Sequence, residues 1–506
     1  MDVHFPGCCI DNTTKNVNAS TTQPVNHRWI PSVNWNIASD IVTCERIKWA
    51  FDCMSPFKSP GEDGIFPALL QKGSTYLLNP IKCIYRASLA LGYIPTAWRI
   101  ARVAFIPKPG KIDYTTAKSF RPISLTSFLL KGLEKLVDRY LRDGPMVTLP
   151  IHPRQHAYQA GKSTESALHQ LVGRIERALD AQEYTLGVFF DIEGAFDNTT
   201  MDSIRTALDD WKVHRSVRNW IIALIKERKI CVKVHDDIIY ASTNRGLPQG
   251  GGLSPTLWSM IADSLLKWLS KRGIYAQGYA DDGVVLVIGI VLSTVCEIMQ
   301  RAVKGIEEWC TSHQLAVNPN KTEMVLFTRR YKIGQMKQIT FYQQELTCVK
   351  QVKYLGVILD SKLNWKAHVD AKCQKAITAF YQLRRTTGKT WGYSPRIVHW
   401  LYTVAIRPML SYAAVVWWNR VDYSTVDKQL EHVQRIACLY ITDAMEVITG
   451  LTPLPIFLKQ EAMTACFRLR MNKQWKHIPF GHARINRELV EIAPETCSRS
   501  DSIIAQ

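Results

Sequence analysis

The sequence predicts an α+β fold that is divided among more than one domain. A chain of 506 residues is too long for a single hydrophobic core. Hydrophobic residues make up 46% of it and charged residues 21%, which is the balance of an ordered globular protein. Strand and helix patterns alternate irregularly along the chain, and this order favours α+β over a doubly wound parallel sheet.

The elements follow from hydrophobic periodicity and turn residues. Residues 1 to 40 are rich in Asn, Thr and Ser and show weak periodicity, so we expect a tail or linker there. Apolar residues at helical spacing predict helices, and short apolar runs that end in turns predict strands. The predicted helices include 45–54, 77–91, 128–141, 163–179, 254–265 and 367–387, and the predicted strands include 101–106, 184–190 and the start of the apolar run 283–295.

The charge balance points to a polyanionic partner. The formal net charge is +19, and a surplus of this size on a large protein favours nucleic acid as the partner, the alternative being a basic solvated surface. The thirteen cysteines include no Cys-x-x-Cys pair, and no apolar signal-peptide core or membrane-length run is present. We therefore expect an intracellular protein that does not enter a membrane.

Three aspartates form the most informative pattern. Asp281 and Asp282 are adjacent and precede an apolar strand, where little water relieves their repulsion, so a cation is expected beside them. Asp191 directly follows the strand 184–190. A hairpin with the Asp pair at its tip would pair with that strand and gather the three carboxylates, which suit two Mg²⁺ ions and polymerase chemistry. Taken alone, the Asp pair is equally well explained by an exposed turn.

A glycine-rich segment, 245–255, lies between the two acidic clusters. Its glycines let the backbone approach a flat ligand closely, and Gln249 is able to hydrogen-bond a nucleotide or a template base. Ser254 and Pro255 then open a helix. Between two carboxylate sites at strand ends, this segment indicates a platform for template and nucleotide.

The order of these motifs resembles the palm of reverse transcriptases, in particular the non-LTR retrotransposon (LINE-type) enzymes of the Jockey and I groups. The resemblance covers roughly residues 45–470. The motifs that carry it are Phe190-Asp191, Ala195-Phe196, Leu247-Pro248-Gln249-Gly250, Leu253-Ser254-Pro255 and Tyr279-Ala280-Asp281-Asp282, with Ser59-Pro60-Gly61, Ile106-Pro107-Lys108-Pro109-Gly110-Lys111, Phe120-Arg121-Pro122-Ile123-Ser124-Leu125, Val317-Asn318-Pro319 and Tyr354-Leu355-Gly356 in family order around them.

This resemblance implies a role for each residue of the metal site. Asp191, Asp281 and Asp282 would hold two Mg²⁺ ions, with the carbonyl of Ile192 as a further ligand. Lys321 would protonate the leaving pyrophosphate, the alternative being a surface lysine.

The resemblance also implies a nucleotide-binding set. Lys108 and Arg121 would bind the triphosphate of the incoming nucleotide, Arg121 through its planar guanidinium. Phe196 would be the steric gate whose ring fills the space that a ribose 2′-hydroxyl needs, and Gln249 would contact the nucleotide. Asp197 is expected to be solvated or to stand behind the ligands.

The implied architecture is a right-hand polymerase with fingers, a palm with an antiparallel sheet, and a helical thumb. Residues 354–360 would form the hairpin that grips the primer, and tryptophans 391, 400, 417 and 418 are expected in the core more than on bases. The predicted divisions are 1–44 tail or linker remnant, 45–185 fingers, 186–345 palm with finger insertions, 346–445 primer-grip hairpin and thumb, and 446–506 a C-terminal helical extension.

The function that this implies is RNA-directed DNA synthesis: attack of a primer 3′-hydroxyl on a dNTP, with an RNA template and a DNA primer or target, in a nuclear and cytoplasmic ribonucleoprotein. An RNA-dependent RNA polymerase is the enzymatic alternative because Asp191 and Asp197 imitate its spaced aspartates, but Phe196 argues against it. A nucleic-acid-binding protein without activity is the other alternative. The sequence departs from the family pattern at Gly251, Gly252 and Gly283, and its segment near residue 443 is shorter than in the family. We expect any endonuclease to be supplied separately.

Overall fold

The computed structural model describes residues 3–10, 34–111, 113–226, 228–234, 236–243, 245–385, 393–442, 451–476 and 480–492. It forms two compact units, each assembled from three segments. The first contains Met1–Pro153, Ile192–Trp268 and Ile306–Val317, and the second Arg154–Asp191, Leu269–Gly305 and Asn318–Gln506. Because the units interleave along the chain, they do not follow the contiguous divisions expected from the sequence, and those boundaries stay a prediction.

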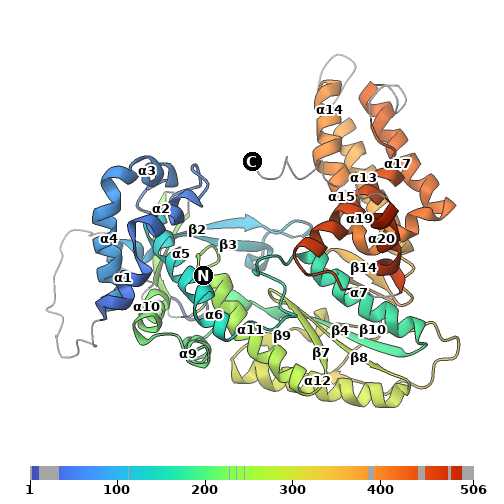
Figure 1. Ribbon diagram of the computed structural model, residues 1–506, viewed down its shortest axis with the longest axis horizontal. Helices are drawn as coiled ribbons and strands as arrows, with labels where there is room; N and C mark the ends of the chain where they lie inside the picture. Colours follow the sequence, from blue (N-terminus) through green and yellow to red (C-terminus); the bar gives the residue numbers. More distant parts are fainter. Residues whose placement is uncertain are drawn as a thin grey trace. The chain divides into compact units, whose positions relative to one another are not determined.

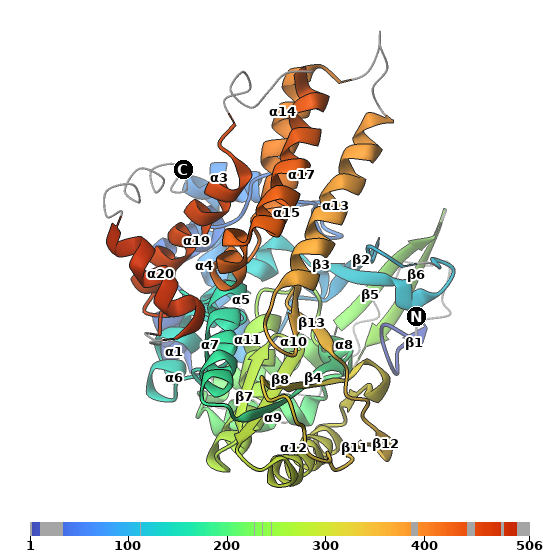
Figure 2. The same ribbon diagram turned by 90° about the vertical axis from the view of Figure 1, so that its right-hand side faces the viewer.

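The first unit contains a five-stranded sheet in the order β1-β6-β5-β2-β3. Its strands are β1 (Cys9–Ile10), β2 (Ile100–Pro107), β3 (Phe120–Leu125), β5 (Arg228–Val234) and β6 (Asp237–Thr243). Among these neighbouring strands only β2 and β5 pair in parallel. Figure 2 shows β2 and β3 beside β5 and β6. The predicted strand 101–106 is confirmed as the centre of β2.

The first unit also contains nine α-helices that lie wholly within it among the described residues. They are α1 (Trp35–Ile41), α2 (Cys44–Asp52), α3 (Pro67–Lys72), α4 (Ser74–Leu91), α5 (Phe128–Asp143), α6 (Pro145–Thr148), α8 (Ala195–Asn198), α9 (Met201–Asp210) and α10 (Arg215–Lys226). The described parts of the predicted tail or linker remnant, 1–44, contain regular elements, because β1 pairs with β6 and α1 is a capped helix. The Asn34 side chain accepts from the backbone N–H groups of Asn36 and Ile37.

The second unit contains the antiparallel sheet β10-β4-β8-β7. Its strands are β4 (Tyr184–Glu193), β7 (Tyr275–Tyr279), β8 (Asp282–Gly289) and β10 (Glu323–Phe327), and β4 is buried from Tyr184 to Phe190. The short β9 (Ala316–Val317) belongs to the first unit, where it pairs with the last two residues of β4. The apolar run 283–295 is a strand only to Gly289, because Ile290 and Val291 are exposed and Leu292 begins helix α12 (Leu292–Ser312). Helix α11 (Ser254–Lys271), like α12, has residues in both units.

Helix α7 (Thr164–Asp180) joins this sheet to a helical bundle in the second unit. Ser163 caps α7 as predicted, and its hydroxyl accepts from the N–H of Ser166. A hairpin of β13 (Gln351–Tyr354) and β14 (Val357–Asp360) precedes the bundle, and β11 (Thr340–Phe341) pairs with β12 (Gln344–Glu345) before it. The bundle contains α13 (Lys366–Arg384), α14 (Pro395–Leu401), α15 (Arg407–Ser411), α16 (Ala414–Trp417), α17 (Ser424–Thr442), α19 (Leu454–Met471) and α20 (Gly481–Ile492).

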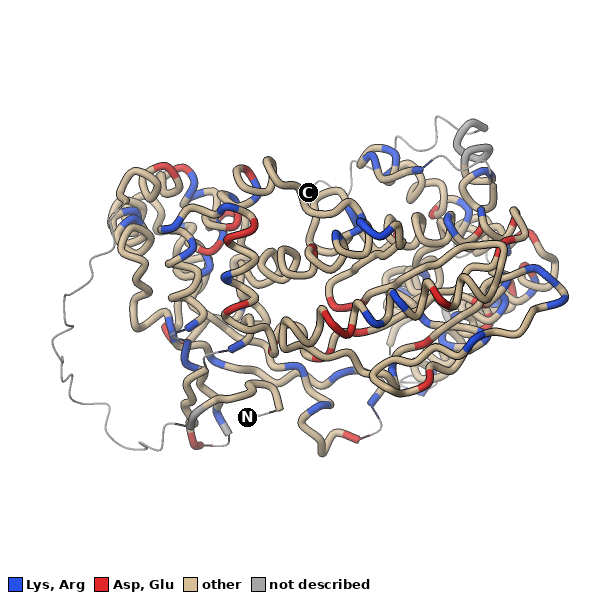
Figure 3. Tube along the Cα trace, turned by 90° about the horizontal axis from the view of Figure 1, so that it is seen from below, with Lys and Arg blue, Asp and Glu red and all other residues tan. Residues whose placement is uncertain are grey.

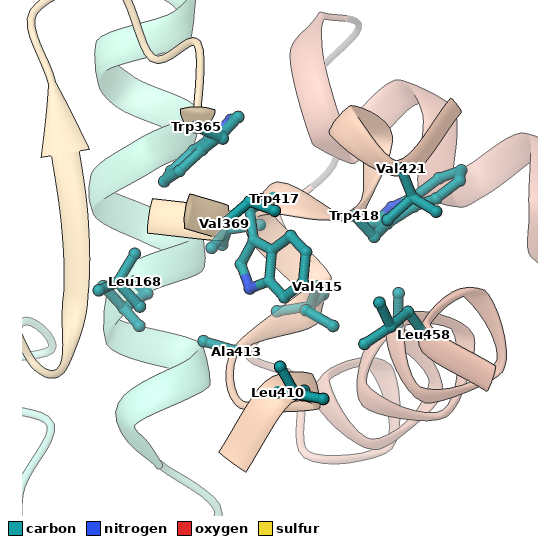
Figure 4. Packing of buried hydrophobic residues seen from close by; sticks show 14 of the residues in the cluster. Leu168, Trp365, Val369, Leu410, Ala413, Val415, Trp417, Trp418, Val421 and Leu458 are labelled. Carbon is teal, nitrogen blue, oxygen red and sulfur yellow. The ribbon is translucent and has the colours of Figure 1, made fainter. Parts of the chain in front are cut away.

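Tryptophans fill the core of the second unit. Trp417 and Trp418 are 1% and 2% exposed, and they pack with Leu168, Val369 and Leu458 from three helices (Figure 4). Their prediction as core residues is confirmed. Trp400 is 58% exposed, so it is not a core residue, and Trp391 lies outside the described residues, as does most of the shortened segment near residue 443.

Basic residues outnumber acidic ones by 63 to 44, and Figure 3 shows their positions spread along the trace instead of confined to one element. None of the described helices is both long enough and apolar enough to cross a bilayer.

The two tryptophan environments make a matched test of packing. Trp417→Ala removes a fully buried ring, and we expect it to lower the free energy of unfolding by about 3–5 kcal/mol. Trp400→Ala removes the same atoms from an exposed site and should change it by no more than about 0.5 kcal/mol. Urea denaturation followed by circular dichroism measures both, and equal effects would contradict the assigned core.

Candidate active site

The three aspartates predicted to bind metal lie at one end of the second unit's sheet. Strand β4 pairs with β8 from Tyr184 opposite Gly289 to Asp191 opposite Asp282. β8 also pairs with β7, and Tyr279 stands opposite Asp282, so Ala280 and Asp281 form a two-residue turn. The predicted hairpin with the Asp pair at its tip, beside the strand of Asp191, is therefore confirmed.

The hairpin turn and its first buried pair have special backbone requirements. Ala280 has a φ of 57°, the left-handed conformation that tight two-residue hairpins demand. Gly283 pairs with Phe190 across β4 and β8, and a Cβ at Gly283 would collide with the Phe190 ring. The glycine that departs from the family pattern is thus required by this packing.

Partial desolvation and like charge act together on Asp282, although the residue stays exposed at the start of β8. Protein around the carboxylate removes part of its hydration, and the nearby Asp281 and Asp191 repel it, so the pKa of Asp282 rises to about 7. Asp191 is partly compensated, because its Oδ2 lies 3.8 Å from the Nζ of Lys321. Lys321 ends a short 3₁₀ turn (Pro319–Lys321) and keeps 57% of its side chain exposed.

The donor chemistry of this site suits a hard divalent cation. Carboxylate oxygens are the ligands that Mg²⁺ prefers, and the raised pKa of Asp282 indicates a cluster short of positive charge. Yet among the described residues no group of three or more His, Cys, Asp or Glu side chains is already arranged around a common metal position. The side chains would therefore have to turn toward an ion, while the strand pairing holds their backbones together. Ile192, the fourth predicted ligand, is the next residue of β4 and is buried.

A buried hydrogen-bond network supports the hairpin, and sequence reasoning missed it. Gln277, two residues before Tyr279 in β7, is 1% exposed. Its amide nitrogen donates to the carbonyl of Ala167 at 3.1 Å and lies 3.4 Å from the hydroxyl of Tyr354, while its oxygen accepts from Tyr275 at 2.9 Å. Gln277 thus ties the β7–β8 hairpin to α7 and to the β13–β14 hairpin. A polar residue inside an apolar strand was the available signal.

The predicted nucleotide-binding residues lie in the first unit, where the glycine-rich segment is docked at several points. The N–H of Leu247 donates to the carbonyl of Phe196 at 2.6 Å, and the N–H of Ser124 in β3 donates to the carbonyl of Gln249 at 2.7 Å. The side chain of Gln249 donates to Asp197 at 2.9 Å. Phe196 and Gln249 are therefore brought together, and Asp197, expected to stand back or be solvated, holds the Gln249 amide.

The two basic residues of this set come from adjacent antiparallel strands. Arg121 in β3 stands opposite Ile106 in β2, and its exposed side chain has no ion pair among the described residues. Lys108 directly follows β2, and its Nζ donates to the carbonyl of Lys118 at 2.9 Å. Burial raises the pKa of Asp197, while the Gln249 hydrogen bond and the positive charges of Arg228 and Lys108 oppose that rise. The positive charge of Lys108 thus acts on Asp197, the carboxylate that accepts from the Gln249 amide.

Two buried charged residues support the glycine-rich segment, and the sequence analysis did not identify them. Glu134 in α5 is 1% exposed and accepts from the N–H of Gly252. Arg228 is 6% exposed and donates to Thr243 and to the carbonyl of Arg245. Glu134 interrupts the apolar face of α5, and that irregularity was the signal. A side chain at Gly252 would crowd Glu134, which explains the glycine there.

A right-hand polymerase has carboxylates at the end of an antiparallel palm sheet, and a helical bundle follows that sheet along the chain. This chain has both features. Residues 106–359, half of the chain, match the family model described as reverse transcriptase (RNA-dependent DNA polymerase). The chain belongs to this family, and its fold is that of the right-hand polymerases.

Within the family the chain is similar to polymerases of non-LTR retrotransposons. It is 26% identical, over 81% of its length, to the Pol polyprotein from the type-1 retrotransposable element R1 of Bradysia coprophila and covers 41% of that protein. It is 27% identical, again over 81%, to the probable RNA-directed DNA polymerase from transposon BS of Drosophila melanogaster and covers 46% of it. It is 28% identical, over 66%, to the RNA-directed DNA polymerase from mobile element jockey of Drosophila funebris and covers 37%. The chain thus spans less than half the length of these relatives.

Among solved structures, apo telomerase from Candida tropicalis matches 79% of this chain and 73% of its own, with 10% identity and a TM-score of 0.39. A score this low carries no weight, and the fold assignment rests on the family match.

The burial of Glu134 predicts a stability that depends on pH. Desolvation raises the Glu134 pKa to about 7, above its unfolded value, so the unfolded state releases its proton first as pH rises. The free energy of unfolding should fall by about 3 kcal/mol between pH 4.5 and 7.5 from this group and then level off.

Glu134→Gln keeps the acceptor for Gly252 and removes the titration, so this fall should disappear from urea titrations across that range. Glu45→Gln, at an exposed position on α2, is the matched control and should leave the profile unchanged. An identical pH profile for Glu134→Gln and the unaltered protein would contradict the assignment.

Proposed function

We propose that this chain is an active RNA-directed DNA polymerase of a non-LTR retrotransposon, which joins a dNTP to a primer 3′-hydroxyl on an RNA template. The observation that carries the proposal is the register that sets Asp191 opposite Asp282 with Asp281 in the adjoining turn. A protein that only bound nucleic acid would have no need for this concentration of negative charge, which opposes binding of a polyanion.

Asp191, Asp281 and Asp282 would hold two Mg²⁺ ions, with the Ile192 carbonyl as a further ligand. When bound, such ions activate the attacking hydroxyl and stabilise the leaving pyrophosphate. Lys321 lies 3.8 Å from Asp191, and we propose that it delivers a proton to the pyrophosphate. Its proximity to a metal-binding carboxylate supports this role over that of a surface lysine.

The residues of the first unit would bind the nucleotide. Arg121 is exposed and unpaired among the described residues, so its guanidinium is available to a triphosphate, with Lys108 on the neighbouring strand. Phe196 would select the deoxyribose. Its backbone carbonyl is fixed by Leu247, and its ring centroid lies 6.1 Å from that of Trp258, which limits how far the ring moves aside.

The remaining partners follow from this activity. With this activity we propose an RNA template and a DNA primer or target. We also propose that the chain works in an intracellular ribonucleoprotein, in the nucleus and the cytoplasm. Any endonuclease that the element needs would act from a separate source or from sequence outside this chain.

Primer extension tests the metal site. On a poly(rA)/oligo(dT) duplex with Mg²⁺ and dTTP, Asp282→Asn should lower the rate by about a thousandfold, because several kcal/mol of metal-dependent stabilisation is lost. Asp237→Asn removes an exposed carboxylate of β6 and should extend normally. Equal extension by Asp282→Asn and the unaltered protein would mean that the measured activity is not its own.

Sugar selection tests Phe196. Phe196→Ala should lower the preference for dTTP over UTP by about tenfold to a hundredfold, because removing the ring opens the space that a 2′-hydroxyl needs. Steady-state kcat/KM for each nucleotide measures this. A preference for UTP in the unaltered protein would instead favour an RNA-dependent RNA polymerase.

A further inference from the structure

A cavity of about 310 Å³ lies within the first unit, apart from the residues assigned to chemistry. It is formed where α1 begins, α4 ends and α10 begins, three helices that Figure 1 shows together. Ala90, Leu91 and Gly92, where α4 ends, also line it. The polar side chains around it are those of Asn34, His214, Arg215, Ser216 and Asn219, and the lining that the described residues form contains no Asp or Glu.

Two hydrogen-bond donors face each other at this cavity. The Nδ1 of His214 accepts from the N–H of Ser216 at 3.2 Å, so the ring proton belongs on Nε2. The Nδ2 of Asn34 lies 3.4 Å from that Nε2. Asn34 cannot turn its oxygen there, because its Oδ1 already accepts from two N–H groups of α1. Two N–H groups at this separation call for an acceptor that both can reach.

Three further donors at the same cavity have no acceptor among the residues that the structure describes. Ser216 is 9% exposed, and its hydroxyl has no hydrogen-bond partner among the described residues. The amide of Asn219 and the exposed guanidinium of Arg215 are likewise without a partner in the part of the chain that the structure describes. The first turn of the twelve-residue helix α10 adds the partial positive charge of its N-terminus.

We propose that this cavity binds a phosphate group of a nucleotide. Donors that converge from α1, from the segment before α10 and from α10 itself match the several acceptor oxygens of a phosphate, and the lack of acidic side chains leaves its charge unopposed. Small-molecule sites begin at about 300 Å³, so the cavity admits the phosphate with part of its nucleoside. A free nucleotide and an RNA strand share this chemistry. The RNA source rests on the proposed function, whereas the phosphate site does not.

Binding by the full chain tests the proposal. Arg215→Gln removes the charge, Ser216→Ala removes the hydroxyl, and Arg215→Lys keeps the charge. Arg205→Gln is the matched control, because Arg205 lies on α9, pairs with Asp202 and does not line the cavity. Adenosine 5′-monophosphate is titrated by calorimetry, and a single-stranded oligoribonucleotide by fluorescence anisotropy over a range of salt concentrations. Thermal unfolding verifies that each variant is folded.

If an RNA phosphate occupies the cavity, Arg215→Gln should reduce the slope of log K against log salt by about 0.7. Ser216→Ala should weaken binding about tenfold without changing that slope. Loss of monophosphate binding in the same variants would identify a free nucleotide as a ligand, and loss of RNA binding alone would identify the strand. Unchanged binding of both ligands by folded Arg215→Gln and Ser216→Ala, or equal losses in Arg205→Gln, would overturn the proposal. If Arg215→Gln does not fold, the binding of Arg215→Lys and Ser216→Ala tests the proposal instead. Arg215→Lys is then expected to keep the slope of log K against log salt, and Ser216→Ala to weaken binding.

The test is independent of polymerase activity. Asp282→Asn, which should lower the extension rate about a thousandfold, should bind both ligands at the cavity as the unaltered protein does. Failure of either proposal is therefore seen separately.

Discussion

Like-charged carboxylates do not gather spontaneously, and in this protein the pairing of β4 with β8 holds them together. Eight successive residue pairs, from Tyr184 with Gly289 to Asp191 with Asp282, fix the register. The apolar side chains of these strands are buried, so hydrophobic burial and backbone hydrogen bonds oppose the repulsion at the end of the sheet. A slip of one residue would turn every side chain to the other face, so the core and the site specify the same register.

Glycines and aromatic rings adjust to one another in this sheet. Gly283 has no side chain, and the ring of its partner Phe190 occupies the space beside it. The expected weakening of the strand by a glycine is therefore offset by cross-strand contact with the ring. Gly187, three pairs nearer the start of β4, is similarly crowded by Leu286, Phe189 and Phe327. Close packing thus reaches from the core to the residue that precedes Asp191.

Features set by local sequence were predictable, and features set by distant contacts were not. The strand before Asp191, the hairpin tip and the Ser163 cap follow from residues within a few positions, and the structure has all three. Helix α1 was missed because seven residues give too few turns for a clear period. The roles of Glu134 and Gln277 depend on partners more than 100 residues away, Gly252 and Ala167. Sequence pattern can mark such a buried polar residue as unusual, but it cannot name its partner.

The glycine-rich segment is held in place by the protein's own hydrogen bonds. Its backbone is fixed through Leu247 to Phe196, through Gln249 to Ser124 and through Gly252 to Glu134. The Gln249 amide is already engaged with Asp197, so a nucleotide or template base would have to share or replace that hydrogen bond. Because the segment is ordered in advance, little conformational entropy is lost on binding, and the buried charge of Glu134 is the cost of that order. Arg228 lies near enough to reduce the cost, since its positive charge opposes the rise in the Glu134 pKa. A neutral partner in place of Arg228 would leave Glu134 more readily protonated, and a protonated carboxyl would hold Gly252 through a weaker, uncharged acceptor.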